Sequence, residues 1–126
     1  MRLLLDCDGI LADFQSMYLS LINSYTGKNY VLEDITDFSI EDSLGVHEYH
    51  DRILEDFEKY HLCYNINPIS YSQEAINFLK RRIEIIIVTS PFKTNGWVNE
   101  RYDWLKLFYD ISSSNVVFCK DKIYIH

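Results

Sequence analysis

Three short apolar runs, separated by longer stretches of helical periodicity, are the feature that most constrains the fold of this chain. Residues 2–6 read RLLLD, residues 83–89 read IEIIIVT and residues 115–119 read NVVFC. Runs of this length and composition that stop at a polar residue are typical of buried strands. Apolar residues recur at helical spacing over 13–25, 46–62, 72–79 and 97–108. Strands that alternate with helices predict an α/β domain with a parallel sheet covered by helices on both faces.

Local signals predict where some of these elements begin and end. Gly27 follows the helix expected over 13–25, and Asn67-Pro68 interrupts the helical pattern that precedes it. Ser72 is a residue type that caps helix N-termini, and it precedes the next periodic stretch. Residues 29–45 have no regular period and predict irregular structure.

Composition narrows the class of protein. The chain has 126 residues, which suits one domain, and a formal net charge of −7, which argues against a nucleic-acid polymer as partner. The longest apolar runs are too short to span a membrane. Cys7, Cys63 and Cys119 are odd in number and widely spaced, and Met1 leads directly into the first strand with no room for a signal peptide. We therefore expect a cytoplasmic protein without membrane attachment.

Polar residues follow each of the three predicted strands. Asp6 and Asp8 lie at the end of the first, Thr89 and Ser90 at the end of the second, and Lys120 and Lys122 after the third. The carboxyl ends of parallel strands share one edge of a sheet, and this edge is where α/β proteins place their chemistry. The sequence therefore predicts one site built from these residues.

The residue types at this edge favour phosphate chemistry. Two carboxylates that face one site raise the pKa of one of them, so that one can act as a nucleophile and the other as a general acid. Gly9 allows a sharp turn after the pair. Thr89 and Lys122 suit a phosphate group, and two carboxylates beside a phosphate favour a hard divalent cation, which we expect to be Mg²⁺.

The motifs together resemble those of the haloacid-dehalogenase (HAD) superfamily of phosphatases. Within it, the chain is similar to the 5′(3′)-deoxyribonucleotidases, the cytosolic type C nucleotidase family. The matching segments are DCDGILADF at residues 6–14, VTSPFK at residues 88–93 and KDK at residues 120–122. The resemblance implies a single HAD-like α/β domain over residues 1–126, with a Rossmannoid parallel sheet, flanking helices and a small helical cap inserted at about residues 15–72.

The resemblance also implies a mechanism. Asp6 would attack phosphorus and carry an aspartyl-phosphate, and Asp8 would protonate the leaving nucleoside and then activate water. Mg²⁺ would be held by the Asp6 carboxylate and by the Asp8 backbone carbonyl. The residues expected to bind the phosphate are Thr89, Ser90, Lys93 and Lys122.

The same resemblance assigns residues to the nucleoside part of a small nucleotide substrate. Phe14 matches an aromatic side chain that stacks on the base. Phe38, Ser39 and Ile40 fall where the cap would close over the base, and Lys120 is expected to contact the phosphate or sugar.

The family pattern includes a fourth motif that would begin just after His126. It consists of Gly-Asp, an apolar strand beside the first strand, and an Asp-Asp pair that completes the metal shell. Three explanations are open: an incomplete sequence, which we favour, a natural short form without activity, or a metal site completed by a second chain. We expect these residues alone to show negligible phosphatase activity with Mg²⁺ and to form homo-oligomers through the unpaired strand edge.

The leading hypothesis is therefore an Mg²⁺-dependent phosphatase of deoxyribonucleoside or ribonucleoside monophosphates. A HAD phosphatase for another small phosphomonoester is the alternative among enzymes. A catalytically inactive binding module that keeps the fold is the alternative outside them.

Overall fold

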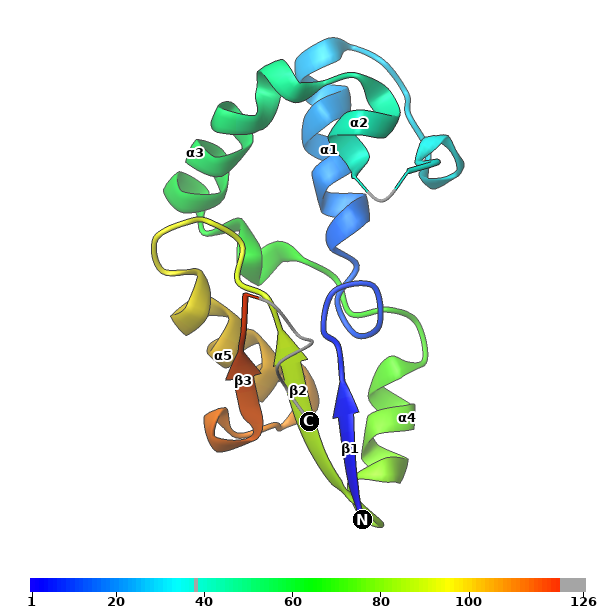
Figure 1. Cartoon of the computed structure of the whole chain (residues 1–126), viewed down its shortest axis with the longest axis vertical. Coiled ribbons are helices and arrows are strands. Elements are labelled where there is room, and N and C mark those ends of the chain that lie inside the picture. The colour runs from blue at the N-terminus through cyan, green and yellow to red at the C-terminus, as the bar shows by residue number, and fades with distance from the viewer. Residues whose placement is uncertain (38, 121–126) are drawn as a thin grey trace.

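The computed structural model describes residues 1–37 and 39–120. A sheet layer with two helices forms one half of the molecule, and a group of helices forms the other (Figure 1). In chain order the elements are β1 Arg2–Leu5, α1 Phe14–Thr26, the 3₁₀ turn Leu32–Asp34, α2 Ile40–Leu44, the 3₁₀ turn His47–Tyr49, α3 His50–Tyr60, the 3₁₀ turn Leu62–Asn65, α4 Ser72–Leu79, β2 Glu84–Thr89, α5 Trp97–Tyr109, the 3₁₀ turn Ser113–Asn115 and β3 Val116–Phe118.

The three predicted strands form one parallel sheet in the order β1-β2-β3. Leu5 pairs with Ile87, and Thr89 pairs with Phe118. All three strands therefore end at the same edge, which confirms the predicted α/β architecture. Asp6, Ser90 and Cys119 are the first residues beyond their respective strands.

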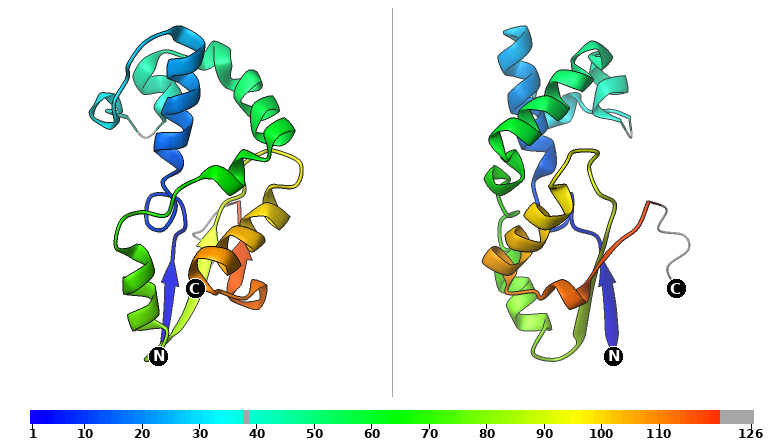
Figure 2. Two further views of the ribbon diagram at one scale, coloured as in Figure 1. Left: turned by 180° about the vertical axis from the view of Figure 1, so that it is seen from behind. Right: turned by 90° about the vertical axis from the view of Figure 1, so that its left-hand side faces the viewer.

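The crossover helices α4 and α5 lie on the same face of the sheet, as the right-hand view of Figure 2 shows. Ser72 Oγ lies 2.6 Å from the Tyr109 hydroxyl, which joins the two helices directly. On the other face Leu4 and Val117 are 43% and 37% exposed. The expectation of helices on both faces is therefore not met in residues 1–37 and 39–120. The reason is that right-handed crossovers between consecutive strands in one direction place their helices on the same side.

The helices α1, α2 and α3 form a separate layer that the chain enters and leaves at adjacent points. Asp13 N–H donates to the Asn67 carbonyl at 2.9 Å, and Ile69 N–H donates to the Leu11 carbonyl at 2.8 Å. The segment that leaves the sheet layer is thus hydrogen-bonded to the segment that returns to it. We call α1–α3 the helical layer.

Local sequence explains most of the helix ends. Asp13 caps α1 by accepting the Ser16 N–H at 3.2 Å, and α1 ends at Gly27 with φ of 73°. Ser39 caps α2, a five-residue helix inside the stretch that the sequence predicts to be irregular. So short a helix has too few turns to produce a recognisable period.

The predicted capping role of Ser72 is wrong. Ser72 is the first residue of α4, and Tyr71 precedes it with φ of 67°. The Ser72 hydroxyl donates to the Ile69 carbonyl at 2.5 Å and contacts Tyr109, so packing against α5 determines its role.

An aromatic cluster joins the helical layer to the sheet layer. Phe14 of α1 and Phe57 of α3 have ring centroids 5.7 Å apart. Phe92, in the loop after β2, lies 5.2 Å from Phe14 and 5.4 Å from Trp97 of α5. Burial of these rings stabilises the contact between the two layers.

Candidate active site

Two carboxylates occupy the turn at the end of β1. The Cys7 carbonyl accepts the N–H groups of Ile10, Leu11 and Ala12 at 3.2, 2.8 and 3.0 Å, which folds the chain back on itself directly after the strand. Gly9 takes φ of 83° in this turn, a conformation that favours glycine. The turn therefore places Asp6 and Asp8 at the edge of the sheet where the sequence predicts them.

Asp6 and Asp8 line one cavity of about 560 Å³ that lies between the β1 turn and the helical layer. Its lining residues are Asp6, Asp8, Gly9, Phe14, Gln15, Tyr18, Ser39, Ile40 and Glu41. One end carries the carboxylate pair and the other carries the start of α2. A cavity of this size accommodates a small organic ligand.

The two carboxylates have different surroundings. Asp6 Oδ1 accepts the Cys7 N–H at 2.7 Å. Asp8 Oδ1 accepts a hydrogen bond from Arg101 Nη2 at 2.8 Å, and the Arg101 side chain is fully buried. Different partners for two nearby carboxylates allow them to take different chemical roles.

Cys7, which lies between the two aspartates in the sequence, is not a reactive thiol. Burial raises the pKa of Cys7 to about 12, despite the opposing effect of Arg101. Cys7 is therefore protonated at neutral pH, and a protonated thiol is a poor nucleophile.

The end of the cavity away from the aspartates contains a third carboxylate, Glu41. The Tyr18 hydroxyl donates to Glu41 Oε1, and His50 Nδ1 lies 2.6 Å from the same oxygen. His47 Nδ1 lies 3.5 Å from Glu41 Oε2. Partial burial acts to raise the pKa of Glu41, but the hydrogen bonds from Tyr18 and His50 outweigh it and hold this pKa below its usual range.

Comparison with known proteins gives the same assignment as the motifs. A family model described as 5′ nucleotidase, deoxy (Pyrimidine), cytosolic type C protein matches residues 1–126. The chain belongs to this family. It is also 29% identical over 119 residues to the 5′(3′)-deoxyribonucleotidase of Bacillus subtilis (strain 168), a match that covers 94% of this chain and 67% of that protein. The 5′(3′)-deoxyribonucleotidase of Bacillus phage SPbeta matches with the same identity and coverage. The resemblance drawn from the three motifs is confirmed.

Of the residues that the family resemblance assigns to the substrate, the structure brings Phe14, Ser39 and Ile40 into the cavity with Asp6 and Asp8. Phe38 and Lys122 lie outside the described residues. This nucleotidase chain thus has carboxylate, aromatic and polar side chains in the lining of one cavity.

The other predicted phosphate contacts do not line this cavity. Thr89 is 1% exposed at the end of β2, and Ser90 Oγ donates to the Cys119 carbonyl at 2.8 Å. Lys93 and Lys120 are exposed side chains near the same edge of the sheet. The hydroxyl of Ser90 therefore connects the ends of β2 and β3 in this structure.

Sequence reasoning missed Arg101, Tyr18 and Glu41 as parts of the site. Tyr18 follows Phe14 by one helical turn, a spacing that could have placed it on the same wall. Arg101 falls at an apolar position of the α5 pattern, and an arginine at such a position is an unusual signal. Glu41 gave no signal, because α2 itself was not predicted.

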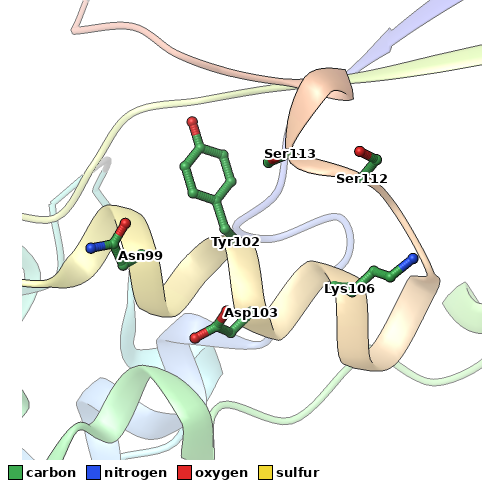
Figure 3. Close-up of a pocket in the computed structure, with 6 residues that line it drawn as sticks. All are labelled: Asn99, Tyr102, Asp103, Lys106, Ser112 and Ser113. Atoms are coloured by element: carbon green, nitrogen blue, oxygen red, sulfur yellow. The ribbon is translucent and has the colours of Figure 1, made fainter.

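A second cavity, of about 580 Å³, is lined by α5 and by Ser112 and Ser113 in the segment that follows it (Figure 3). Its lining includes one carboxylate, Asp103, which accepts a hydrogen bond from the Tyr64 hydroxyl at 2.8 Å. Lys106, also in the lining, lies 2.6 Å from Asp110. The two cavities have no lining residue in common, and this one has no carboxylate pair, so the site at the β1 turn is the stronger candidate.

Proposed function

We propose that the protein is an Mg²⁺-dependent phosphatase that hydrolyses deoxyribonucleoside or ribonucleoside monophosphates to nucleoside and phosphate. The observation that carries this proposal is that one cavity is lined both by the carboxylates Asp6 and Asp8 and by Phe14, Ser39 and Ile40. A nucleoside monophosphate likewise combines an anionic reacting group with a flat base, joined by the sugar. Membership of the deoxyribonucleotidase family supports this choice over other phosphomonoesters.

The proposed reaction has two steps, with Asp6 as nucleophile. The Asp6 carboxylate attacks phosphorus, the bond from phosphorus to the nucleoside oxygen breaks, and Asp8 donates a proton to that oxygen. Asp8 then removes a proton from water, and the water oxygen attacks the aspartyl-phosphate. Inorganic phosphate leaves, and the Asp6 carboxylate is regenerated.

The residues present fit a magnesium ion. In residues 1–37 and 39–120, no three His, Cys, Asp or Glu side chains are grouped closely enough to hold a metal. Mg²⁺ retains several water molecules and usually needs only one or two protein carboxylates together with a substrate phosphate, and the pair at the β1 turn meets this need. We propose the Asp6 carboxylate and the Asp8 backbone carbonyl as its ligands. When bound, the ion neutralises charge on the phosphate.

We propose that the helical layer is the cap, at about residues 15–72, and that it binds the base. Phe14 is placed to stack on the base, and Ser39 and Ile40 border it, together with Phe38. Phe14 is the residue of the aromatic cluster that lines the cavity, and the exposed part of its ring is the surface available for stacking. Base stacking on an aromatic side chain contributes roughly 1–3 kcal/mol.

We propose that Thr89, Ser90, Lys93 and Lys122 bind the phosphate and that Lys120 contacts the phosphate or sugar. Their support is their position: Thr89 is the last residue of β2, and Ser90 and Lys93 follow it, at the same edge of the sheet as Asp6. Ser90 would have to exchange its bond to the Cys119 carbonyl for one to phosphate.

We expect the protein to act in the cytoplasm on a small nucleotide. We also expect the chain to associate with copies of itself. No described helix has both the length and the apolar character needed to cross a bilayer. The net charge of −7 disfavours a nucleic-acid polymer.

Phosphate release by the protein encoded in its complete reading frame tests the proposal. With Mg²⁺, we expect hydrolysis of dUMP and dTMP to exceed that of a sugar phosphate, and we expect a chelator to abolish both. Faster hydrolysis of the sugar phosphate would favour the alternative of a phosphatase for another small phosphomonoester. Loss of all hydrolysis in a folded protein that still binds dUMP would favour the non-catalytic module.

A further inference from the structure

Arg101 of α5 is the most deeply buried charged group near the candidate site. Its side chain has no exposed surface, whereas that of Asp8, its partner at 2.8 Å, is 33% exposed. The two residues are 93 positions apart in the sequence, so the pairing depends entirely on how α5 packs against the β1 turn.

The guanidinium of Arg101 is held between two indole rings. Its central carbon lies 4.7 Å from the ring centroid of Trp97 and 5.1 Å from that of Trp104. Trp104 is itself fixed, because its Nε1–H donates to the Ile66 carbonyl at 2.8 Å. Stacking on two rings restricts the guanidinium to one orientation.

Burial of this arginine is costly for the fold. Within the described residues, Arg101 Nε and Nη1 are buried without a hydrogen-bond partner. Buried polar groups that lack partners destabilise a protein, and replacement of a buried ion pair as a whole by apolar side chains of similar volume is often neutral or stabilising. Stability therefore does not account for an arginine here, whereas the bond to Asp8 at the cavity does.

We propose that Arg101 is a positioning residue that acts through Asp8, an inference that rests on the proposed function. Arg101 Nη2 donates a hydrogen bond to Asp8 Oδ1, and this bond fixes the orientation of the carboxyl group about its side-chain torsion. The oxygen that delivers a proton to the leaving group is then Oδ2. Arg101 is not itself among the residues that line the cavity, so it acts on the reaction only through its contact with Asp8.

The dependence of catalysis on the leaving group tests this role. Release of a nucleoside needs protonation of a poor leaving group, whereas para-nitrophenolate leaves readily without a proton. If Arg101 orients Asp8, Arg101→Met should lower kcat on dUMP by about 10²-fold, the scale of general acid catalysis, and change KM little. Because Asp8 also assists the later attack of water with either substrate, the leaving-group step is compared by rapid-quench measurement, and the first-turnover release of para-nitrophenolate should slow several-fold at most.

Two further variants separate positioning from a general effect on folding. Arg101→Lys keeps a cation and a donor, and it should recover part of the turnover of dUMP. Arg2→Gln is the matched control, since Arg2 pairs with Glu84 at 2.7 Å on the exposed surface, at the end of β1 away from Asp6. It should leave both activities unchanged.

A double variant is the sharpest test. In a protein that already carries Asp8→Asn, Arg101→Met should cost little further activity on dUMP, because the residue it acts through is gone. Equal losses in the leaving-group step of both substrates, or a full additional loss in the Asp8→Asn protein, would overturn the positioning role alone. Absence of hydrolysis of either substrate by the unaltered protein would instead overturn the proposed function and the role of Arg101 with it.

Discussion

The two ends of the candidate active-site cavity are built in different ways. Asp8, at one end, pairs with a fully buried arginine held between two tryptophans. Glu41, at the other end, is bound by Tyr18 and by His50 and His47, whose side chains are 42% and 62% exposed. One end is fixed by the core of the sheet layer, and the other depends on the five-residue helix α2 and on imidazoles that water reaches.

This difference suggests a division between chemistry and substrate selection. A catalytic carboxylate must be placed precisely, and rigid packing provides that precision. A site that accepts a base can depend on weaker and more solvated contacts. Changes at the β1 turn should therefore alter the rate, and changes at α1 and α2 should alter substrate preference and the response to pH.

The largest expected effect is at the carboxylate end. In the proposed mechanism, Asp6→Asn keeps the shape of the side chain and removes the charge of the nucleophile, so phosphate release from dUMP should fall by several orders of magnitude, as expected for covalent catalysis. Rapid-quench detection of a phosphorylated protein checks the same step and should fail in the variant. Turnover near that of the unaltered protein would be incompatible with nucleophilic attack by Asp6.

A smaller effect is expected at the aromatic wall. Phe14→Ala should weaken transition-state binding of deoxynucleotides by roughly 1–3 kcal/mol through loss of stacking, with little change for para-nitrophenyl phosphate. Phe14 also packs in the aromatic cluster, so thermal unfolding must be measured in parallel. Phe14→Leu, which keeps most of the packing volume, is the control. Equal losses on the two substrates would favour a phosphatase without base recognition.

The Glu41 end should respond to pH. The folded-state pKa of Glu41 is lowered, so ionised Glu41 stabilises the fold above the unfolded pKa, and this contribution is lost as the pH falls through the folded-state value. Glu41→Gln should lower the free energy of unfolding by about 1.5–3 kcal/mol near neutral pH, the range for hydrogen bonds to a charged group. Thermal unfolding of both proteins from neutral to acid pH should show this difference shrink as Glu41 becomes protonated. A difference that does not change with pH would contradict the role of its charge.

The smallest effect is expected at the solvent-exposed ion pair between Arg2 and Glu84. Arg2 and Glu84 are 69% and 49% exposed, so Arg2→Gln should change the free energy of unfolding by about 0.5 kcal/mol or less. Urea unfolding measures this, with Arg101→Met as the buried counterpart. A large loss of stability in Arg2→Gln would mean that the exposed pair of Arg2 and Glu84 does not differ from the buried pair of Arg101 and Asp8.

The sequence by itself determined the elements of the sheet and the position of the carboxylates. β2 was predicted from its β-branched run, and Asp6 and Asp8 follow β1 where the apolar run stops. These features depend on backbone sterics, side-chain alternation and turn chemistry, all of which act over a few residues. Phe14 was identified through the family motif that begins at Asp6.

Only the tertiary structure decided which side chains meet. Arg101 reaches Asp8 because the right-handed crossover through α5 packs that helix beneath the β1 turn, a contact between residues 93 positions apart. Glu41 borders the cavity because the helical layer folds back over the sheet edge, and Ser90 is turned toward the Cys119 carbonyl by the pairing of β2 with β3. Periodicity reports only how each segment buries its own apolar side chains, and these contacts depend on how separate segments pack together.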